Sequence, residues 1–438
     1  MKIYMRLVLL ASFIFSGCFV SAQIINIGNR IENKVNNRVN NKIDQGIDKG
    51  LDAVEDDISG KNKESDKNKS KKSKAKQTAA ENPDVATPGE VTISETKPAA
   101  PQDKPSMQTY SKYDFIPGEK VLYFDDFMAT AVGDFPPNWN TTASGEVVTN
   151  SILPGNWFKM IGEGCISLEE GIKLPENYTI EFDVIPYTLD ENNVSFEYGF
   201  YLYSAQNPKD LFEGGAVPGL NGGIKMSFGY RATYSAYDVE GYTISGEKAD
   251  ATMEAGKKYR LSFWVQKTRL RVYQDQVKIF DLPKVFAPGM ICNQMRFELW
   301  GESGPIITNF RIAAGMPDMR SKLITEGKLV TYGIYFDVNK DVVKPESYGT
   351  LKGIADVLKE NPTVRVKIVG HTDSDGADAS NLDLSKRRGA SVKAELIKNF
   401  GIDAARLESD GLGETKPVSP NDTPSNKAMN RRVEFIKL

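Results

Sequence analysis

The pattern of apolar residues changes once along the folded part of this 438-residue chain, and the change limits what the chain can form. From residue 113 to residue 315, apolar and polar residues alternate in short runs such as Tyr178–Val184 and Tyr259–Val265, with turn residues between them. Alternation with period two puts every second side chain on one face of a strand. Many such runs without a helical stretch predict an antiparallel β-sandwich of the jelly-roll type over residues 113–315.

After the sandwich, strand-like and helix-like stretches alternate. We expect strands at residues 329–336, 364–370, 406–411 and 432–436, and amphipathic helices at residues 346–360 and 384–400. Such an order predicts a small α/β domain over residues 325–438, with the helices on one face of a sheet.

The N-terminus is typical of an exported protein. Lys2 and Arg6 precede an apolar run from Leu7 to Phe15 that is too short to span a membrane, so residues 1–22 are predicted to be a signal peptide. Cleavage after Ala22 is one interpretation. The other is lipidation of Cys18, because Phe15-Ser-Gly-Cys18 resembles the lipobox of bacterial lipoproteins.

Residues 23–112 are expected to form no packed domain. Tetrads with an apolar first residue run from Ile27 to Leu51, and a period of four drifts about 40° per repeat around a helix of 3.6 residues per turn. A self-associating helix and disorder both fit. Residues 61–76 hold eight lysines against two acidic residues, and residues 77–108 are rich in Pro, Ala, Thr and Ser, which favours a disordered linker.

Composition excludes several kinds of partner. A net charge of −3 argues against nucleic acid, and no metal-ligand motif or phosphate loop occurs, so we expect neither a metal nor a cofactor. Once Cys18 is lost or modified, Cys165 and Cys292 remain as an even pair in an oxidising compartment. They form either a disulfide or two buried thiols.

The sole histidine of the chain lies in Gly370-His-Thr-Asp373, at the end of the second expected strand of the α/β domain. The carboxyl ends of strands are where open α/β sheets carry binding loops. On the helix that follows, Leu384, Arg388 and Val392 share one face, so Arg388 occupies an apolar slot. An unpaired buried charge costs on the order of 3 kcal/mol or more. Arg388 therefore needs an anion, either Asp373 or one from a ligand.

Spaced residues of this region resemble the OmpA-like C-terminal domain family over residues 328–438. They are Phe336-Asp-Val-Asn-Lys340, Gly370-His-Thr-Asp373, Gly376, Asn381, Leu384-Ser385, Arg388 and Asn430-Arg-Arg432. Gly389 departs from the family, which usually has Ala at this position, and a helical glycine costs about 1 kcal/mol unless close packing uses it.

The resemblance implies a site. The family binds the peptide stem of peptidoglycan without covalent bonds, through a diaminopimelate end that carries an ammonium and a carboxylate on one carbon. By the resemblance, Asp373 takes the ammonium and Arg388 takes the carboxylate with a two-pronged fork. Asn339, Asn381 and Arg431 line or support the same groove, although Asn381 also fits a helix cap. The implied location is the periplasm or outer membrane of a Gram-negative-type envelope.

The sandwich carries weaker signals. Val121–Phe127, Leu174–Phe182 and Ile307–Ile312 look like parts of concanavalin-like sandwich domains, which often bind glycans through surface aromatics. The candidate aromatics are Trp139, Trp157, Trp264 and Trp300, each of which also fits the core. Asp125 and Asp126 would need further ligands to hold calcium. Glycan binding and protein binding by the sandwich both remain open, as does contact with the outer membrane or its proteins.

An enzyme is the less favoured interpretation. His371 has no nucleophile or oxyanion hole with which to form a triad, so we expect a structural or groove-lining histidine and no catalytic residue there. The alternative is a wall-anchored glycan-processing enzyme whose sandwich is catalytic. It needs two carboxylates that face each other across a groove, for which Glu181, Asp183 and Glu197 are candidates.

Overall fold

The computed structural model describes residues 113–438, except 189–195, 212–221, 239–240, 302 and 317. The described residues lie in one compact unit, residues 103–438. The predicted signal peptide, Cys18, the tetrads and the linker lie outside the described residues. Within the described residues, no helix has the length and apolar character needed to cross a membrane.

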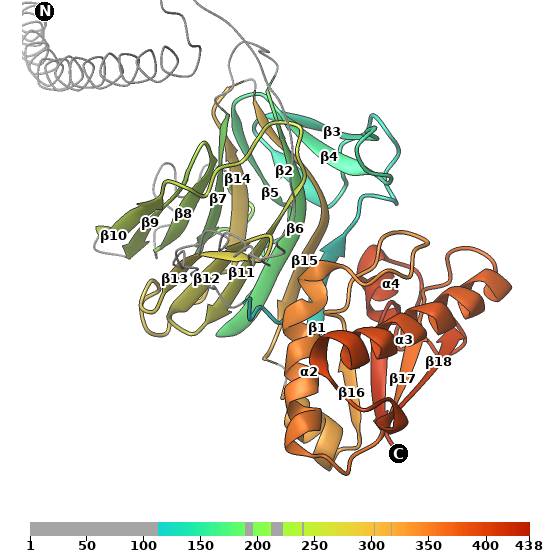
Figure 1. Cartoon of the computed structure of the whole chain (residues 1–438). Helices are drawn as coiled ribbons and strands as arrows, with labels where there is room; N and C mark the ends of the chain where they lie inside the picture. The colour runs from blue at the N-terminus through green and yellow to red at the C-terminus, as the bar shows by residue number, and fades with distance from the viewer. Residues whose placement is uncertain (1–112, 189–195, 212–221, 239–240, 302, 317) are drawn as a thin grey trace, which may run out of the picture. The chain divides into compact units, whose positions relative to one another are not determined.

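Two antiparallel sheets form the first part of this unit (Figure 1). The first has the order β13-β12-β11-β6-β15-β4-β3, with β1 also paired to β15, and the second has the order β10-β9-β8-β7-β14-β5-β2. The strands of the first sheet are β1 (Lys120–Asp125), β3 (Ser144–Val148), β4 (Trp157–Ile161), β6 (Asn177–Tyr187), β11 (Tyr259–Gln266), β12 (Arg269–Gln274), β13 (Val277–Leu282) and β15 (Gly304–Ala314). Those of the second are β2 (Trp139–Thr141), β5 (Gly164–Leu168), β7 (Glu197–Tyr203), β8 (Gly223–Gly229), β9 (Ala232–Asp238), β10 (Gly241–Lys248) and β14 (Gln294–Leu299). The predicted sandwich of β-sheets is confirmed.

Aromatic side chains fill the space between the two sheets. Phe182 from the first sheet packs against Phe200 and Phe297 from the second, with ring centroids 5.3 and 5.4 Å apart. Such offset and edge contacts add to the burial of the rings themselves. Strand β6 is buried along both faces, so its other face, with Glu181 and Asp183, is covered as well.

Most of the tryptophans proposed as glycan contacts belong to the core. Trp139, Trp157 and Trp264 are buried, and only Trp300 is exposed, at 44%. A buried ring has no face for a sugar, so the core interpretation holds for three of the four candidates. Asp125 is also engaged, because it accepts hydrogen bonds from the Nε1 of Trp139 at 3.2 Å and from the backbone N of Phe127 at 2.9 Å.

Cys165 and Cys292 are both buried free thiols, so the disulfide is not formed. The register of the second sheet gives the reason. Cys165 in β5 lies opposite Glu298 in β14, six residues from Cys292. At about 3.3 Å per residue, this offset is roughly 20 Å, far beyond the about 7 Å between Cα atoms that a disulfide tolerates. Burial raises the pKa of the Cys292 thiol to about 12.

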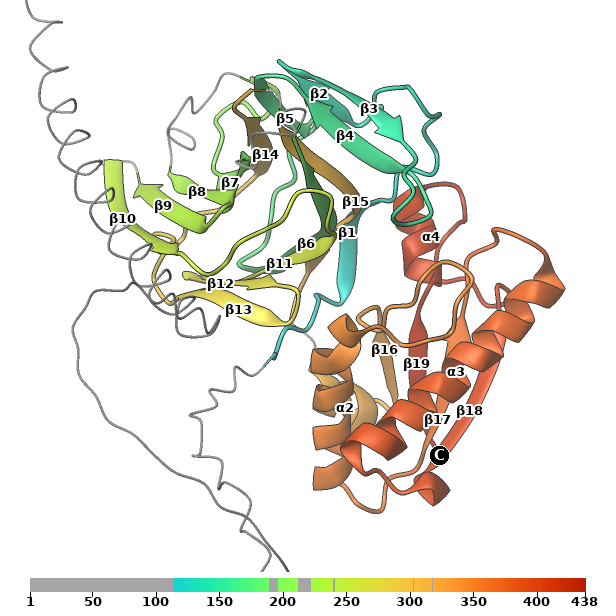
Figure 2. The same cartoon turned by 45° about the horizontal axis from the view of Figure 1, so that its top comes forward.

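The C-terminal part is a small α/β domain (Figure 2). Its sheet has the order β16-β19-β17-β18, in which β17 and β18 are parallel and the other pairs are antiparallel. The elements are β16 (Lys328–Thr331), α2 (Tyr348–Glu360), β17 (Val366–His371), α3 (Asp378–Phe400), β18 (Leu407–Gly413), α4 (Pro424–Asn430) and β19 (Val433–Lys437), with single turns at Ser321–Thr325, Pro345–Ser347 and Ala404–Arg406. The predicted α/β character is confirmed. Strand β16 ends at Thr331, so residues 332–336, which the sequence predicted as further strand, belong instead to the loop of residues 332–347 that leads to α2.

Glycines let α3 lie directly on the sheet. A Cβ on Gly389 would come within 2.5 Å of the carbonyl oxygen of Asp410 in β18, and one on Gly370 would come within 2.3 Å of the carbonyl oxygen of Ser385. Both distances are shorter than real Cβ contacts. Close packing therefore explains Gly389, and it brings the helix face with Arg388 next to the end of β17.

Candidate functional site

The five predicted site residues lie around one cavity of about 740 Å³. Asn339, Asp373, Asn381, Arg388 and Arg431 all line it. They come from the loop after β16, the loop after β17, helix α3 and the end of α4. The structure thus brings together residues that are up to 92 positions apart in the sequence.

The guanidinium of Arg388 is held in place without being neutralised. Its Nε donates to the carbonyl of Lys340 at 3.0 Å and its Nη2 to that of Asp337 at 3.3 Å. The group also stacks on the ring of Phe336, 4.8 Å from the centroid. No carboxylate among the described residues forms an ion pair with it. Burial, followed by the charge of Arg431, lowers the pKa of Arg388 to about 10, so the side chain is still charged at neutral pH.

Asp373 is paired with another arginine. Its Oδ2 accepts from the Nη1 of Arg431 at 2.6 Å, and its Oδ1 accepts from the backbone N of Asp375 at 3.2 Å. The salt bridge between Asp373 and Arg388 that the sequence left open is therefore not formed. Asp373 therefore offers a fixed carboxylate and Arg388 a fixed cation, and both line the same cavity.

Asn381 supports this arrangement, and Asn339 lines the same cavity. Asn381 lies in the first turn of α3 rather than at its N-cap, which is Ala377. Its Nδ2 donates to the carbonyl oxygens of Asp373 and Asp375 and to a carboxylate oxygen of Glu414, so it ties the loop after β17 to the helix. Asn339 is exposed and has a φ of 57°, a left-handed conformation that asparagine tolerates well.

His371 also lines the cavity. It is buried, and its Nε2 lies 3.6 Å from the carboxylate of Glu434. Burial raises the pKa of Glu434, but the contacts with His371 and Lys328 outweigh it and lower the pKa to about 2. Within the part of the chain that the structure describes, no group of three His, Cys, Asp or Glu side chains could hold a metal ion.

The sandwich also reaches the cavity, which sequence reasoning missed. Arg431 lies over the ring of Phe124, 5.0 Å from the centroid, and its Nη2 is 3.5 Å from a carboxylate oxygen of Asp126. The Oγ of Ser425 accepts from the backbone N of Phe124 at 2.9 Å and donates to its carbonyl at 3.3 Å. Phe124 and Asp126 both line the cavity. No local sequence pattern reveals a contact across some 300 residues.

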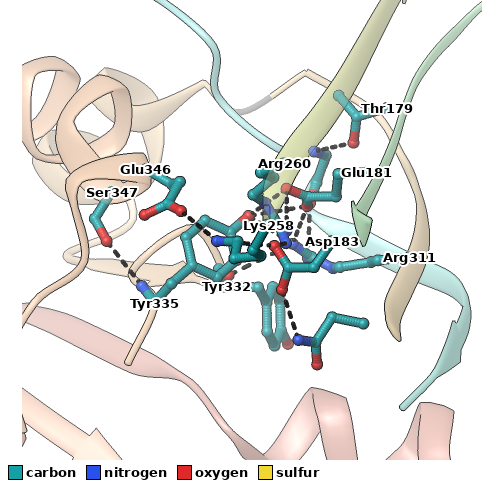
Figure 3. A network of polar contacts seen from close by, with 12 residues as sticks. Thr179, Glu181, Asp183, Lys258, Arg260, Arg311, Tyr332, Tyr335, Glu346 and Ser347 are labelled. Carbon is teal, nitrogen blue, oxygen red and sulfur yellow. Dashed lines mark hydrogen bonds and ion pairs between the residues drawn. The ribbon is translucent and has the colours of Figure 1, made fainter. Parts of the chain in front are cut away.

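A second polar cluster lies where the loop of residues 332–347 covers the first sheet (Figure 3). Glu181 is fully buried and accepts from Arg260 at 2.7 Å, from Arg311 at 3.0 Å and from the hydroxyl of Tyr335 at 2.8 Å. Burial raises the pKa of Glu181, but the charges of Arg260 and Arg311 outweigh it and hold the pKa below its usual value. The carboxylate is therefore ionised and fully engaged.

The contacts in this cluster also argue against Glu181 and Asp183 as the carboxylate pair of a glycan-processing enzyme. Asp183 is bound by Arg260 at 3.1 Å and by Asn309 at 2.8 Å. Burial raises the pKa of Asp183, but the charges of Arg260 and Lys258 outweigh it and hold the pKa well below its usual value. Neither Asp183 nor Glu181 can hold a proton to donate near neutral pH. Glu197 belongs to β7 in the other sheet, so the three candidates do not face one another across a groove.

Comparison with known proteins agrees with this description of the C-terminal part. Residues 335–431 match the sequence model of the OmpA family, and this region is an OmpA-like domain. Outer membrane porin F of Pseudomonas fluorescens is 46% identical over 105 residues, which are 24% of this chain and 32% of the relative. The probable lipoprotein YiaD of Escherichia coli K12 is 44% identical over 102 residues, 23% of this chain and 46% of the relative.

The chain thus spans less than half the length of these two relatives. Among solved structures, the peptidoglycan-associated lipoprotein of Burkholderia pseudomallei is 30% identical and covers 24% of this chain and 88% of its own, with a TM-score of 0.23. The description as an OmpA-like domain rests on the family match and on the sequence relatives.

Proposed function

We propose that this chain is a cell-envelope protein that binds peptidoglycan without covalent bonds, through the diaminopimelate of the stem peptide. Asp373 would accept hydrogen bonds from the ammonium, and Arg388 would bind the carboxylate on the same carbon with two parallel hydrogen bonds. Asn381 and Arg431 would hold Asp373 in place, and the loop that contains Asn339 would hold Arg388.

The observation that supports this proposal most directly is the state of Arg388. It is half-buried and charged, and it is oriented by two carbonyl groups and a ring on the wall of a cavity. Its charge lacks a carboxylate partner among the described residues. A fixed cation and a fixed carboxylate in the lining of one cavity are complementary to a zwitterion. Binding rather than catalysis is what such a pair of charges performs.

We further propose that the protein acts in the periplasm or at the outer membrane, consistent with the names of its relatives, an outer membrane porin and a probable lipoprotein. Cys18 would be either removed with the signal peptide or lipidated. Mass spectrometry of the mature N-terminus distinguishes the two, since a chain that begins at Gln23 contradicts lipidation.

The test is a pull-down of the full chain on purified diaminopimelate-type peptidoglycan. Asp373→Ala and Arg388→Ala are expected to lose binding while remaining folded. Arg387→Ala is the matched control, because Arg387 is the neighbouring exposed arginine and pairs with Asp383 and Asp341 on the surface. Retention of binding by Arg388→Ala, or equal losses in Arg387→Ala, would contradict the proposal.

A further inference from the structure

The cavity extends beyond the five predicted residues onto the β-sandwich. Its lining includes Phe124, Asp126, Met128 and Pro154, which belong to β1 and to the segments between β1 and β4. A volume of about 740 Å³ is typical of pockets that enclose most of a ligand of drug size, which run from roughly 300 to 1,000 Å³. One ammonium and one carboxylate on a single carbon fill only the space between Asp373 and Arg388. The remaining space can hold a further part of the same ligand.

The part of the cavity lining that belongs to the sandwich includes a strained turn at Phe127. Phe127 has a φ of 57°, which is rare for a bulky side chain, and its ring is fully buried. Asp125 fixes the turn by accepting hydrogen bonds from the backbone N of Phe127 and from Trp139. Strain of this kind persists only where the surroundings enforce it, and it concentrates at ligand sites. The two residues that flank Phe127, Asp126 and Met128, line the cavity.

These two side chains are complementary to a peptide. Met128 is 61% exposed, so a ligand that covers it gains from the burial of apolar surface. The carboxylate of Asp126 is 3.5 Å from Arg431, longer than a strong ion pair, and it can accept a further N–H. An acceptor next to a flexible apolar side chain suits a backbone amide with a small aliphatic side chain beside it.

Building on the proposed function, we propose that the β-sandwich forms the second wall of the stem-peptide site. Met128 and Asp126 contact the part of the peptide that adjoins its diaminopimelate, while Asp373 and Arg388 bind the zwitterionic end. The sandwich is then a component of the binding site itself. It contributes affinity for the whole peptide and none for free diaminopimelate.

The experiment is calorimetric titration of the full chain with two soluble probes, diaminopimelic acid alone and a stem tetrapeptide that contains it. Met128→Ser is expected to weaken tetrapeptide binding by about tenfold and to leave diaminopimelic acid binding unchanged, because only the longer probe reaches the sandwich. Val277→Ser is the matched control. Val277 is 55% exposed on β13 and does not line the cavity, so this variant is expected to match the wild type with both probes.

Two results would overturn the inference. One is wild-type affinity of Met128→Ser for the tetrapeptide. The other is an equal loss for both probes, because the residue would then act on the whole site rather than on the added wall. Failure of the proposed function looks different: Arg388→Ala would bind both probes as the wild type does, or the wild type would bind neither and the wall would lose its ligand.

Discussion

Arg388 is a cation whose partners among the described residues are two carbonyl oxygens and a ring face. These partners orient the guanidinium but do not neutralise it. Its pKa is lowered to about 10 from an unfolded value near 12.5. Because the folded pKa is the lower one, the charge reduces the stability of the folded state at neutral pH, and this loss declines only as the pH rises through 10. A charged group that lowers the stability of the folded state is typical of a binding site in which the ligand supplies the opposite charge.

Replacement of Arg388 should therefore separate stability from binding. We expect Arg388→Met to leave the free energy of unfolding unchanged or to raise it by up to about 1 kcal/mol, because an unpaired charge is removed from a half-buried slot. Peptidoglycan binding should be lost. Urea unfolding at pH 7 measures the first effect. A loss of about 3 kcal/mol or more, as for an arginine of an internal buried ion pair, would argue for a structural role.

The sequence predicted Arg388 but not its surroundings. Helical periodicity alone put a charge in an apolar slot, and the structure shows Leu384 and Val392 buried on the same face. The partner of Asp373 was beyond such reasoning. Arg431 lies 58 residues away, and its position depends on the short helix α4. No periodic pattern of apolar residues predicts this helix.

At the scale of elements, helix α3 determines the geometry of the cavity. The sequence predicted its start at residue 384, where the apolar period begins, but the helix begins at Asp378. The first turn is polar because it serves the loop after β17, through the hydrogen bonds of Asn381. The C-terminal end was predicted correctly at Phe400, where Gly401 adopts a left-handed φ of 68° and ends the helix.

The contact of α3 with the sheet leads to a counter-intuitive prediction. Alanine favours a helix over glycine by about 1 kcal/mol. Gly389→Ala should nevertheless lower the free energy of unfolding by about 1–3 kcal/mol, because the new Cβ meets the backbone of Asp410 at 2.5 Å. Ala390→Gly at the adjacent exposed position should cost only about 1 kcal/mol, from helix propensity. Thermal unfolding checks both, and a stabilised Gly389→Ala variant would show that α3 can move away from β18.

At the scale of the whole compact unit, the sandwich and the OmpA-like domain share buried charge. From the sequence, Glu181 and Asp183 were candidates for a catalytic pair, and period-two alternation in β6 was equally compatible with ordinary outward-facing strand residues. Both face away from the sandwich core and are nevertheless buried, and Tyr335 of the loop 332–347 donates a hydrogen bond to Glu181 (Figure 3). Alternation shows which side chains of a strand point toward the opposite sheet of the sandwich. It does not show whether another segment covers the opposite face.

The loop 332–347 connects this cluster to the proposed site. Tyr335 donates to Glu181 at one side of the loop, while the carbonyl oxygens of Asp337 and Lys340 hold Arg388 at the other. We expect Tyr335→Phe to weaken stem-peptide binding several-fold, because the loop loses a buried hydrogen bond worth about 1 kcal/mol or more.

The control is Tyr187→Phe, which removes a hydroxyl that donates to the carbonyl of Met160 at 2.6 Å, away from the cavity. Both variants should lose similar stability. Calorimetry measures the affinity of both variants for the stem peptide. Equal affinity of Tyr335→Phe and Tyr187→Phe would mean that the hydrogen bond between Tyr335 and Glu181 does not influence the binding site through the loop.

The most direct test of the central claim compares two peptides on the wild-type chain. One is the stem tetrapeptide with diaminopimelate, and the other has lysine there, which keeps the ammonium but lacks the terminal carboxylate. The account predicts at least ~30-fold weaker binding of the lysine peptide, because Arg388 is then left without its anion, and no such difference in Arg388→Ala. Equal affinity of the wild type for the two peptides would contradict it.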